Sequence, residues 1–461
     1  MAKLTDEKLL SLSFGAAFID GVSLSSVESL SEKFKNGDSW LRENAARRNE
    51  GFGWLNLPGA RVEEIRALSR WLATRESIVQ IGIGGSALGN LMLNNAMLPP
   101  YWNELPEKTR NAPRFFLSDN VDPVDNRAIW NLLNPDSTAF IVVSKSGATA
   151  ETMANFLFFW ERLRDKIGES AARERVIVIT DKDKGILRPF VDEIGCKSLV
   201  LPEDVGGRYS VLTCVGLLSG WALGIDCDSL LMGAGAMDKH IAATEQVMSN
   251  PAWIMSGLSY LHSKKSRNMS VLMPYVDALE RFCEWYAQLW GESIGKNGKG
   301  TTPIRALGAI DQHSQVQLYT EGPDDKLFTI LTVEKNSTDV FIPAAPQKSL
   351  EKLSYLYGKS MNDLRNSEAL STAAALVKAN RPVMTLQIPA LDAYRLGALI
   401  QFYEYVTGMM GWLLEIDPFN QPGVEQGKNY TYGLMGRAGY ELEAEEVNKL
   451  SALISEKIVQ L

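Results

Sequence analysis

The stretch IVQIGIGGSALGNLMLNNAM (residues 78–97) joins a short apolar run to a glycine-rich turn and then to a helix-favouring segment. The run IVQIGI (78–83) has the length and composition of a buried β-strand, and residues 87–97 have the composition of a helix. A strand that leads through glycines into a helix is typical of α/β proteins with a parallel sheet. This stretch therefore predicts the first strand of such a sheet.

Further apolar runs recur along the chain, separated by helical stretches such as residues 151–166. A first series continues with FFLSD (115–119), AFIVV (139–143), VIVIT (176–180) and SLVLP (198–202). A second series comprises MSVLMP (269–274), ALGAI (306–310), FTILTV (328–333) and VMTLQI (383–388). Continuous apolar strands between helices indicate a parallel sheet covered on both faces, so we expect two doubly wound α/β domains. The sequence repeat itself is too weak to establish a duplication.

The two ends of the chain differ from this pattern. Residues 1–50 are charged and helix-compatible without a strand signal, which predicts an N-terminal helical arm. We assign residues 51–235 to the first α/β domain and residues 236–461 to the second. Residues 441–461 form an amphipathic helix in this interpretation, and we expect it to pack onto its own domain. Its apolar positions are Val447, Leu450, Ile454, Ile458 and Leu461.

Composition limits the partners that the chain can have. Its 461 residues, 45% of them hydrophobic, suffice for two or three domains with sizeable cores. The net charge is −8 and no basic stripe occurs, which argues against nucleic acid and against an acidic membrane surface as partners. An anionic substrate would have to be captured by local groups.

The compartment is inferred from the cysteines and from the apolar segments. Cys196, Cys214, Cys227 and Cys283 lie far apart without CxxC spacing, so we expect buried thiols in a reducing compartment. The N-terminus has no apolar signal-peptide core. The longest uncharged run, residues 209–225, is broken by three glycines and predicts a buried helix. We expect a soluble cytoplasmic protein.

The segment GIGGS (82–86) is the first candidate phosphate cradle. Glycines at a strand-to-helix junction let backbone N–H groups approach an anion. Residues 82–87 also fit the dinucleotide fingerprint G-x-G-x-x-A, but the acidic ribose-binding residue is missing, because Asp119 lies too far along. A tight turn without a ligand explains this motif alone equally well.

The segment SKSGAT (144–149) repeats this arrangement after a later strand. Its hydroxyls, on Ser144, Ser146 and Thr149, suit the three oxygens of a phosphate monoester. The alternative is that Thr149 merely caps the following helix. Lys145 is the only charged residue of this segment. Because the chain has no Walker A motif, phosphoryl transfer is disfavoured.

Three histidines occur, and only one has the surroundings of a catalytic group. His313 lies in DQHSQ (311–315), where Asp311 is an adjacent carboxylate that could set its tautomer for acid/base work. His240 and His262 follow or precede basic residues and are interpreted as solvated surface residues.

Glu292 is the candidate base. It follows Trp285, Tyr286 and Trp290, and a carboxylate among aromatic side chains is partly desolvated and therefore more basic. Gln288 lies four residues earlier, on the same helical face. The alternative is an ordinary glutamate that faces water at a helix end.

Two further segments contribute cations. In VGGRYS (205–210), two glycines precede Arg208, whose guanidinium could reach a cleft and stabilise a developing enediolate oxygen. The alternative for Arg208 is a surface ion pair. FNQPGVEQGK (419–428) brings Gln421, Glu425 and Lys428 together in what its glycines and proline predict to be a loop before the C-terminal helix.

Taken in chain order, these motifs resemble those of the glucose-6-phosphate isomerase family. The resemblance extends from GIGGSALG to FNQPGVEQGK, and VGGRYS and FNQPGVEQGK are its most specific parts. It implies two sugar-isomerase domains, a homodimer, and a reaction that needs no metal and no organic cofactor. The expected activity is reversible isomerisation of D-glucose 6-phosphate and D-fructose 6-phosphate in glycolysis and gluconeogenesis.

The same resemblance implies the role of each matching residue. Glu292 would move a proton between C2 and C1, Arg208 would stabilise the cis-enediolate, and His313 and Lys428 would open the sugar ring. Gln288 and Gln421 would bind sugar hydroxyls. The groups that hold the phosphate or the adjacent sugar would be Gly85, Ser86, Ser144, Lys145, Ser146 and Thr149.

Three other functions use parts of this pattern. A sugar-phosphate-sensing regulator would keep the cradle at 144–149 but would lack the base and would carry a DNA-reading region. The isomerase half of an aminosugar synthase would need an N-terminal cysteine, where this chain has Ala-Lys-Leu at residues 2–4. An NAD-dependent dehydrogenase would need the acidic residue missing after GIGGSA.

Overall fold

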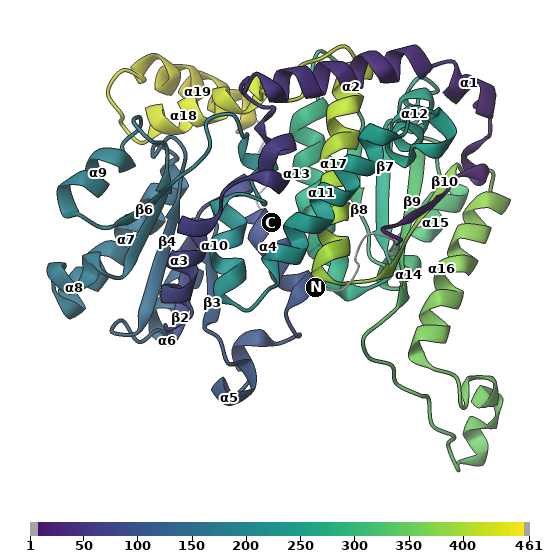
Figure 1. Cartoon of the computed structure of the whole chain (residues 1–461), viewed down its shortest axis with the longest axis horizontal. Coiled ribbons are helices and arrows are strands. Elements are labelled where there is room, and N and C mark those ends of the chain that lie inside the picture. Colours follow the sequence, from purple (N-terminus) through teal and green to yellow (C-terminus); the bar gives the residue numbers. More distant parts are fainter. Residues whose placement is uncertain (1–7, 456–461) are drawn as a thin grey trace. The chain divides into compact units, whose positions relative to one another are not determined.

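The structure, a computed structural model, describes residues 8–455 and has a mixed α/β architecture (Figure 1). The described chain divides into two compact units, the first ending at Pro418 and the second beginning at Phe419. The first unit contains two five-stranded sheets.

The first sheet is parallel throughout and has the strand order β3-β2-β4-β5-β6. Its strands are β2 (Ser77–Ile81), β3 (Arg114–Ser118), β4 (Thr138–Val143), β5 (Val176–Thr180) and β6 (Lys197–Val200). The five apolar runs of the first series therefore mark the strands correctly. Strand β2 pairs with β3 on one side and β4 on the other, with Ile78 opposite both Phe115 and Ala139.

Both faces of this sheet are covered by helices, as expected for a doubly wound domain. Alternate residues of β4 point to opposite faces, so Ile141 joins one buried core and Phe140 the other. The first core includes α3 (Glu63–Leu72) and α10 (Cys214–Ala222). The second includes α6 (Pro123–Leu132), α7 (Ala150–Ile167), α8 (Glu169–Arg173) and α9 (Leu187–Ile194).

The second sheet has the order β1-β10-β9-β7-β8, parallel except for β1, which pairs antiparallel with β10. Its strands are β1 (Ser11–Ser13), β7 (Met269–Pro274), β8 (Thr302–Arg305), β9 (Lys326–Lys335) and β10 (Val383–Ala390). One face packs on α15 (Val316–Glu321) and α16 (Met361–Lys378). Residues of α12 (Pro251–Ser263), α13 (Glu280–Ile294) and α17 (Ala393–Leu413) pack on the other. The second domain is therefore also doubly wound.

One predicted strand is wrong. ALGAI (306–310) forms the connection into α14 (Ile310–Ser314), whereas the strand is β8, four residues earlier. β8 is an incompletely buried edge strand that contains Pro303, so its sequence lacks an apolar run. Ala306 and Leu307 are buried in the connection, which explains the misleading apolar signal.

The N-terminal segment is helical, as predicted, but it also contributes a strand. It contains α1 (Leu24–Glu28) and α2 (Ser31–Ala46), and β1 extends the edge of the second sheet with Leu12 opposite Leu386. The prediction that this segment has no strand is wrong, because three residues at a sheet edge leave almost no periodic signal in the sequence.

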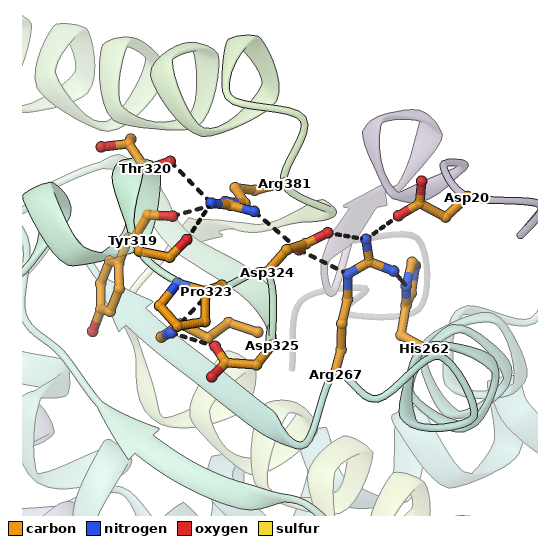
Figure 2. A network of polar contacts seen from close by, with 11 residues as sticks. Asp20, His262, Arg267, Tyr319, Thr320, Pro323, Asp324, Asp325 and Arg381 are labelled. Atoms are coloured by element: carbon orange, nitrogen blue, oxygen red, sulfur yellow. Dashed lines mark hydrogen bonds and ion pairs between the residues drawn. The ribbon is translucent and has the colours of Figure 1, made fainter.

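An ionic network around the buried Arg267 and His262 anchors this segment (Figure 2). The guanidinium of Arg267 contacts Asp20 of the N-terminal segment, and its Nε donates to Asp324 Oδ1 at 3.0 Å. It also lies 3.3 Å from His262 Nδ1. Asp324 forms a second ion pair with Arg381 at 3.4 Å. The network thus connects the N-terminal segment to three loops of the second sheet.

His262 was expected at the surface, and this prediction is wrong. Its ring is fully buried, with Nε2 at 2.9 Å from the carbonyl oxygen of Ala17. Burial and the nearby Arg267 charge lower the pKa of His262 to about 4. The basic residues after His262 suggested exposure, but Arg267 folds inward. His240 is exposed, as predicted.

The proposed boundary at residue 235 falls inside a helix, α11 (Cys227–Ala243), so the division into 51–235 and 236–461 stays a prediction. α11 packs closely on α17, the most buried helix of the first unit. A Cβ on Gly233 would lie 1.7 Å from the Tyr394 oxygen, and one on Gly397 would lie 1.8 Å from the Leu230 oxygen. These two glycines therefore permit backbone contact between the helices.

The cysteine and membrane expectations can be compared with residues 8–455. All four cysteines are free thiols, three of them buried and Cys196 half-buried. The uncharged run at 209–225 contains the nine-residue helix α10, of which eight residues are buried. Over the described part of the chain, every helix is too short or too polar to cross a membrane.

The second unit begins with a short turn, η9 (Pro422–Val424), followed by α18 (Glu425–Leu434) and α19 (Glu441–Ile454), which pack on each other. The amphipathic C-terminal helix is thus present, although Ile458 and Leu461 lie outside the described residues. Glu425 and Lys428 were expected in a loop but lie in the first turns of α18. Pro422 is compatible with the first turn of a helix, so its presence did not exclude one.

Candidate functional site

The two candidate cradles follow neighbouring strands of the first sheet. The segment 82–86 follows β2, and the segment 144–149 follows β4. The chain continues from β2 to β3 on one side, while β4 lies on the other side of β2, so the cradles flank the topological switch point. Open α/β sheets bind ligands at this position.

The first cradle is a close contact between two glycine-rich turns. Gly84 has a φ of +58°, which favours glycine. A Cβ on Gly85 would lie 2.2 Å from the carbonyl oxygen of Gly207, so no side chain fits between the two turns. Ser210 Oγ donates to the Gly85 oxygen at 3.1 Å. The turn that carries Gly85 and Ser86 is thereby held against the turn that carries Arg208.

Buried side-chain amides form hydrogen bonds that hold the backbone of the first cradle. Gln80 Nε2 donates to the Ser86 carbonyl at 2.8 Å and to Asn90 Oδ1 at 2.9 Å. Asn90 Nδ2 donates in turn to Ser219 Oγ at 2.8 Å. This chain of hydrogen bonds fixes the backbone at Ser86 and leaves its partly exposed side chain available.

The second cradle has hydroxyls that its own backbone positions. Ser144 Oγ accepts from the Gly147 N–H at 3.1 Å and lies 3.5 Å from Thr149 Oγ1. Ser146 Oγ, which is exposed, accepts from the Ala148 N–H at 3.2 Å. Thr149 precedes α7 without making a side-chain cap bond, so the interpretation of Thr149 as a mere cap is wrong.

Lys145 connects the second cradle to the arginine segment. Its Nζ donates to the Glu203 carbonyl at 2.8 Å and to the Val205 carbonyl at 3.4 Å. Both carbonyls lie just before Gly206 and Gly207. The ammonium is therefore held in a defined place between the two segments.

Arg208 is buried, with only 3% of its surface exposed, so the surface ion pair considered for it is wrong. Its Nε donates to Ser293 Oγ at 2.7 Å, its Nη1 to Glu292 Oε2 at 3.2 Å, and its Nη2 to the Pro418 carbonyl at 2.7 Å. A guanidinium with a partner on each nitrogen is rigidly oriented, which suits it to stabilise negative charge at one position.

Glu292 and Gln288 lie one turn apart on α13, as the sequence predicted. Glu292 Oε1 accepts from Gln288 Nε2 at 3.0 Å, and the Glu292 side chain is 30% exposed. The carboxylate was expected among aromatic side chains, but it contacts the polar Gln288 and the cationic Arg208. Trp285 and Trp290 are buried in the core instead.

Gln288 also reaches the first cradle. A Cβ on Gly84 would lie 2.9 Å from Gln288 Nε2, so the amide lies directly over this glycine. Gln288 Oε1 is buried and has no hydrogen-bond partner among residues 8–455. An acceptor of this kind is suited to a ligand hydroxyl.

His313 lies on α14 and is exposed. Asp311 was expected to orient it, but Asp311 accepts from the Leu307 N–H at 2.7 Å and from Ser314 Oγ at 2.6 Å. Within the described chain, the structure does not bring His313 into hydrogen-bond contact with Arg208 or Glu292. The prediction that Asp311 orients the His313 ring is therefore wrong.

Gln421 and Lys428 belong to the second compact unit. Gln421 precedes the turn η9, and Lys428 Nζ forms an ion pair with Glu425 Oε1 at 2.8 Å on α18. Both ion-pair partners are exposed, and such pairs contribute little to stability.

Lys296 is a charged group near the site that the sequence analysis missed. Its Nζ donates to the backbone carbonyls of Glu292 and Ser293 at 2.8 and 2.7 Å. Partial burial, together with the charge of Arg208, lowers the pKa of Lys296 to about 8. Asn-Gly after the helix predicts a tight turn, but this local signal does not reveal where the Lys296 side chain points.

The first unit thus brings together a carboxylate, a fixed guanidinium, an amide and two hydroxyl- and N–H-rich cradles. This set can accept and return a proton beside a bound anion. Over residues 8–455, no group of three or more His, Cys, Asp and Glu side chains is arranged to hold a metal ion.

Known proteins share both the sequence and the fold. The sequence profile of the phosphoglucose isomerase family matches residues 69–327 and 335–445. The glucose-6-phosphate isomerase of Carboxydothermus hydrogenoformans is 41% identical, covering 95% of this chain and 94% of its own length. That of Rubrobacter xylanophilus is 43% identical, covering 84% of this chain and 90% of its own.

A solved structure agrees with the fold. A glucose-6-phosphate isomerase from Chlamydia trachomatis matches with a TM-score of 0.78 at 23% identity, covering 97% of this chain and 93% of its own. A protein from Thermus thermophilus described as hypothetical, TT0462, has a TM-score of 0.84 at 34% identity, covering 92% of this chain and 100% of its own.

Proposed function

The chain belongs to the phosphoglucose isomerase family and interconverts D-glucose 6-phosphate and D-fructose 6-phosphate, and we propose that Glu292 is the base of this reaction. The observation that supports this assignment most is the contact of Glu292 Oε2 with Arg208 at 3.2 Å, next to the cradle at residues 82–86. Glu292 removes the proton from C2 of the open-chain aldose and returns it to C1. In the reverse direction the same carboxylate works from C1 to C2.

Arg208 stabilises the intermediate in this proposal. Loss of the C2 proton places negative charge on the oxygen at C1. The hydroxyl proton at C2 then moves to this oxygen, which leaves the charge on the oxygen at C2, and a fixed cation close to the base lowers the energy of both forms of the enediolate. The three acceptors of Arg208 hold the guanidinium in place before substrate arrives, so little reorganisation is needed during the reaction.

The phosphate is held by neutral donors rather than by a metal. We assign this role to the cradle hydroxyls and to free backbone N–H groups, with Lys145 beside them. Gln288 and Gln421 bind sugar hydroxyls. Phosphate binding far from the reacting carbons supplies energy that orients C1 and C2 against Glu292.

Ring opening is assigned to His313 and Lys428. It must precede proton transfer, because the cyclic sugar has no carbonyl group that acidifies the C–H bond. This assignment rests on the family motifs. Within the second unit, Lys428 lies on a helix and is partly exposed, so its ammonium is accessible.

The active assembly is a homodimer in the cytoplasm in our proposal. Its support is an exposed apolar surface on the segment from β9 to α16, which extends away from the second sheet (Figure 1). Phe341 and Tyr355 are each 69% exposed, and Leu370 is 73% exposed. Exposed large apolar groups of this kind mark interaction sites, and a second copy of the chain is the partner that the family resemblance implies.

The overall assignment is tested by a coupled assay that measures glucose 6-phosphate formed from fructose 6-phosphate, with EDTA present. We expect full activity in EDTA and only very slow turnover of free fructose. Complete loss of activity that added metal restores would contradict the metal-free reaction. Absence of isomerisation with either substrate would contradict the function itself.

A further inference from the structure

The segment after α13 forms a tight turn whose two lysines point back to helix ends. In Lys296-Asn297-Gly298-Lys299, φ is +54° at Asn297 and +70° at Gly298, and the Lys299 N–H donates to the Lys296 carbonyl at 2.8 Å. Two consecutive positive φ angles indicate a type I′ turn, for which Asn-Gly is the favoured pair. The turn therefore fixes the spacing of the two lysine backbones.

Lys296 binds the end of α13. Its Nζ donates to the carbonyls of Glu292 and Ser293, which lie in the last turn of the helix. Carbonyls in the last turn of a helix lack partners within the helix, and a cation there also interacts favourably with the helix dipole. Lys296 thus holds the backbone of the two α13 residues whose side chains contact Arg208.

Lys299 binds the end of another helix. Its Nζ donates at 2.7 Å to the carbonyl of Leu414, the residue that caps α17. Pro418, five residues after the end of α17, has a carbonyl that accepts from Arg208 Nη2 at 2.7 Å. The same turn therefore holds the helix that leads to the third acceptor of Arg208.

The backbone that follows Lys299 is also constrained. Gly300 has a φ of +105°, and a Cβ there would lie 2.4 Å from the carbonyl oxygen of Ile294. The chain after Lys299 therefore passes directly against the end of α13. The turn is packed on the helix and is not a free loop.

We propose that Lys296 and Lys299 are positioning residues, which together form a two-lysine clamp that sets the placement of the Glu292 carboxylate against the Arg208 guanidinium. The clamp acts through backbone carbonyls and does not touch substrate. It rests on the proposed role of Glu292 as the base. Its effect is therefore on the chemical step and only weakly on substrate binding.

The test uses the full-length enzyme with Lys296→Met, Lys299→Met and Lys296→Arg, each compared with wild type for kcat and KM on fructose 6-phosphate. Lys197→Met is the matched control, because Lys197 Nζ also contacts a backbone carbonyl, that of Glu174 at 3.4 Å, away from Glu292. We expect kcat to fall about 10- to 100-fold in Lys296→Met and less in Lys299→Met, with KM changed less than about 3-fold. Lys296→Arg keeps a cation that can bind two carbonyls and should recover most of the loss.

A second readout separates positioning from stability. A five-carbon aldonate 5-phosphate carries a carboxylate that resembles the enediolate, so its inhibition constant should rise in parallel with the loss of kcat. Thermal unfolding shows whether each variant is folded at the assay temperature. If Lys296→Met does not fold, Lys299→Met and Lys296→Arg provide the same comparison.

The outcomes distinguish this inference from the proposed function. Wild-type kcat in folded Lys296→Met and Lys299→Met, with Glu292→Gln inactive, would overturn the clamp and leave the base assignment intact. Near-normal kcat in Glu292→Gln would overturn the base assignment, and the clamp with it. Equal losses in Lys197→Met and Lys296→Met would mean a general effect of removing lysines and would also overturn the clamp.

Discussion

At the scale of single residues, the pairing of Glu292 with Arg208 leads to the first prediction. Glu292→Gln keeps the size of the side chain and its contact with Gln288 while it removes the basic group. We expect kcat to fall by about 10² to 10⁴. KM should change little. Steady-state kinetics in both directions measure this, and near-normal kcat would refute the assignment.

A second prediction concerns Glu404 in α17. Its carboxyl group is fully buried and both oxygens lack hydrogen-bond partners over the described chain, so burial raises the pKa of Glu404 well above its usual range. A raised pKa means that the folded state keeps a proton that the unfolded state releases. The proton on Glu404 therefore stabilises the folded state fully at a pH below the pKa that Glu404 has in the unfolded chain. This contribution is lost as the pH rises toward the pKa of Glu404 in the folded state.

Urea unfolding at pH 5 and pH 8 tests this prediction. Glu404→Gln is neutral at both pH values. The free energy of unfolding of this variant, relative to that of wild type, should therefore be higher at pH 8 than at pH 5. Glu445→Gln, at an exposed glutamate of α19, is the control and should show no such change. An identical pH dependence for wild type and Glu404→Gln would contradict a neutral buried carboxyl group.

At the scale of loops and helices, the cradle at residues 144–149 predicts how phosphate is recognised. Ser146→Ala combined with Thr149→Ala removes two hydroxyls, and each neutral hydrogen bond contributes about 1 kcal/mol. We expect KM for fructose 6-phosphate to rise about 10-fold or more, with a smaller change in kcat. Ser170→Ala, at an exposed serine of α8, is the control. An unchanged KM in the double variant would remove this loop from the phosphate site.

The buried pair of Arg267 and His262 gives a prediction about acid stability. The pKa of His262 is about 4 in the folded protein, below its ordinary value of 6.5, so the unfolded chain binds more protons between these values. The contribution of the neutral His262 to the free energy of unfolding is therefore fully present above pH 6.5 and is lost as the pH falls through 4. The shift corresponds to a contribution on the order of 3 kcal/mol.

This prediction is measured by unfolding His262→Gln and His240→Gln across pH 4 to 7. The loss of stability on acidification should be smaller in His262→Gln than in wild type, because the variant has no buried imidazole to protonate. His240→Gln changes an exposed histidine and should follow wild type. The same acid sensitivity in both variants would mean that His262 does not titrate in this range.

At the scale of the whole molecule, the proposed homodimer predicts that two defective subunits can complement each other. If His313 is donated to the site that contains the partner's Glu292, a heterodimer of Glu292→Gln and His313→Ala has one site with both defects and one intact site. Random pairing after joint refolding should then restore about a quarter of wild-type activity. Refolding each variant alone is the control. Proven heterodimers without activity would place His313 in the site of its own chain.

The sequence alone determined the local elements. Eight of the nine apolar runs mark strands, because a strand buried on both faces must be apolar at every position. The segments 82–86 and 144–149 follow strands, and Gln288 and Glu292 lie one turn apart on a helix, as the local glycine, hydroxyl and helical-spacing signals predict. The exceptions are β8 and β1, which lie at sheet edges and need few apolar residues.

Only the tertiary structure decided which of these groups meet. The contacts of His262 with Ala17, of Arg208 with Ser293, Glu292 and the Pro418 carbonyl, and of Lys299 with the Leu414 carbonyl all join segments far apart in sequence. Such contacts are set by the packing of helices and sheets, and a pattern within a short window of sequence carries no record of them. The residue types required by the chemistry could therefore be predicted, whereas their orientation and their electrostatic partners could not.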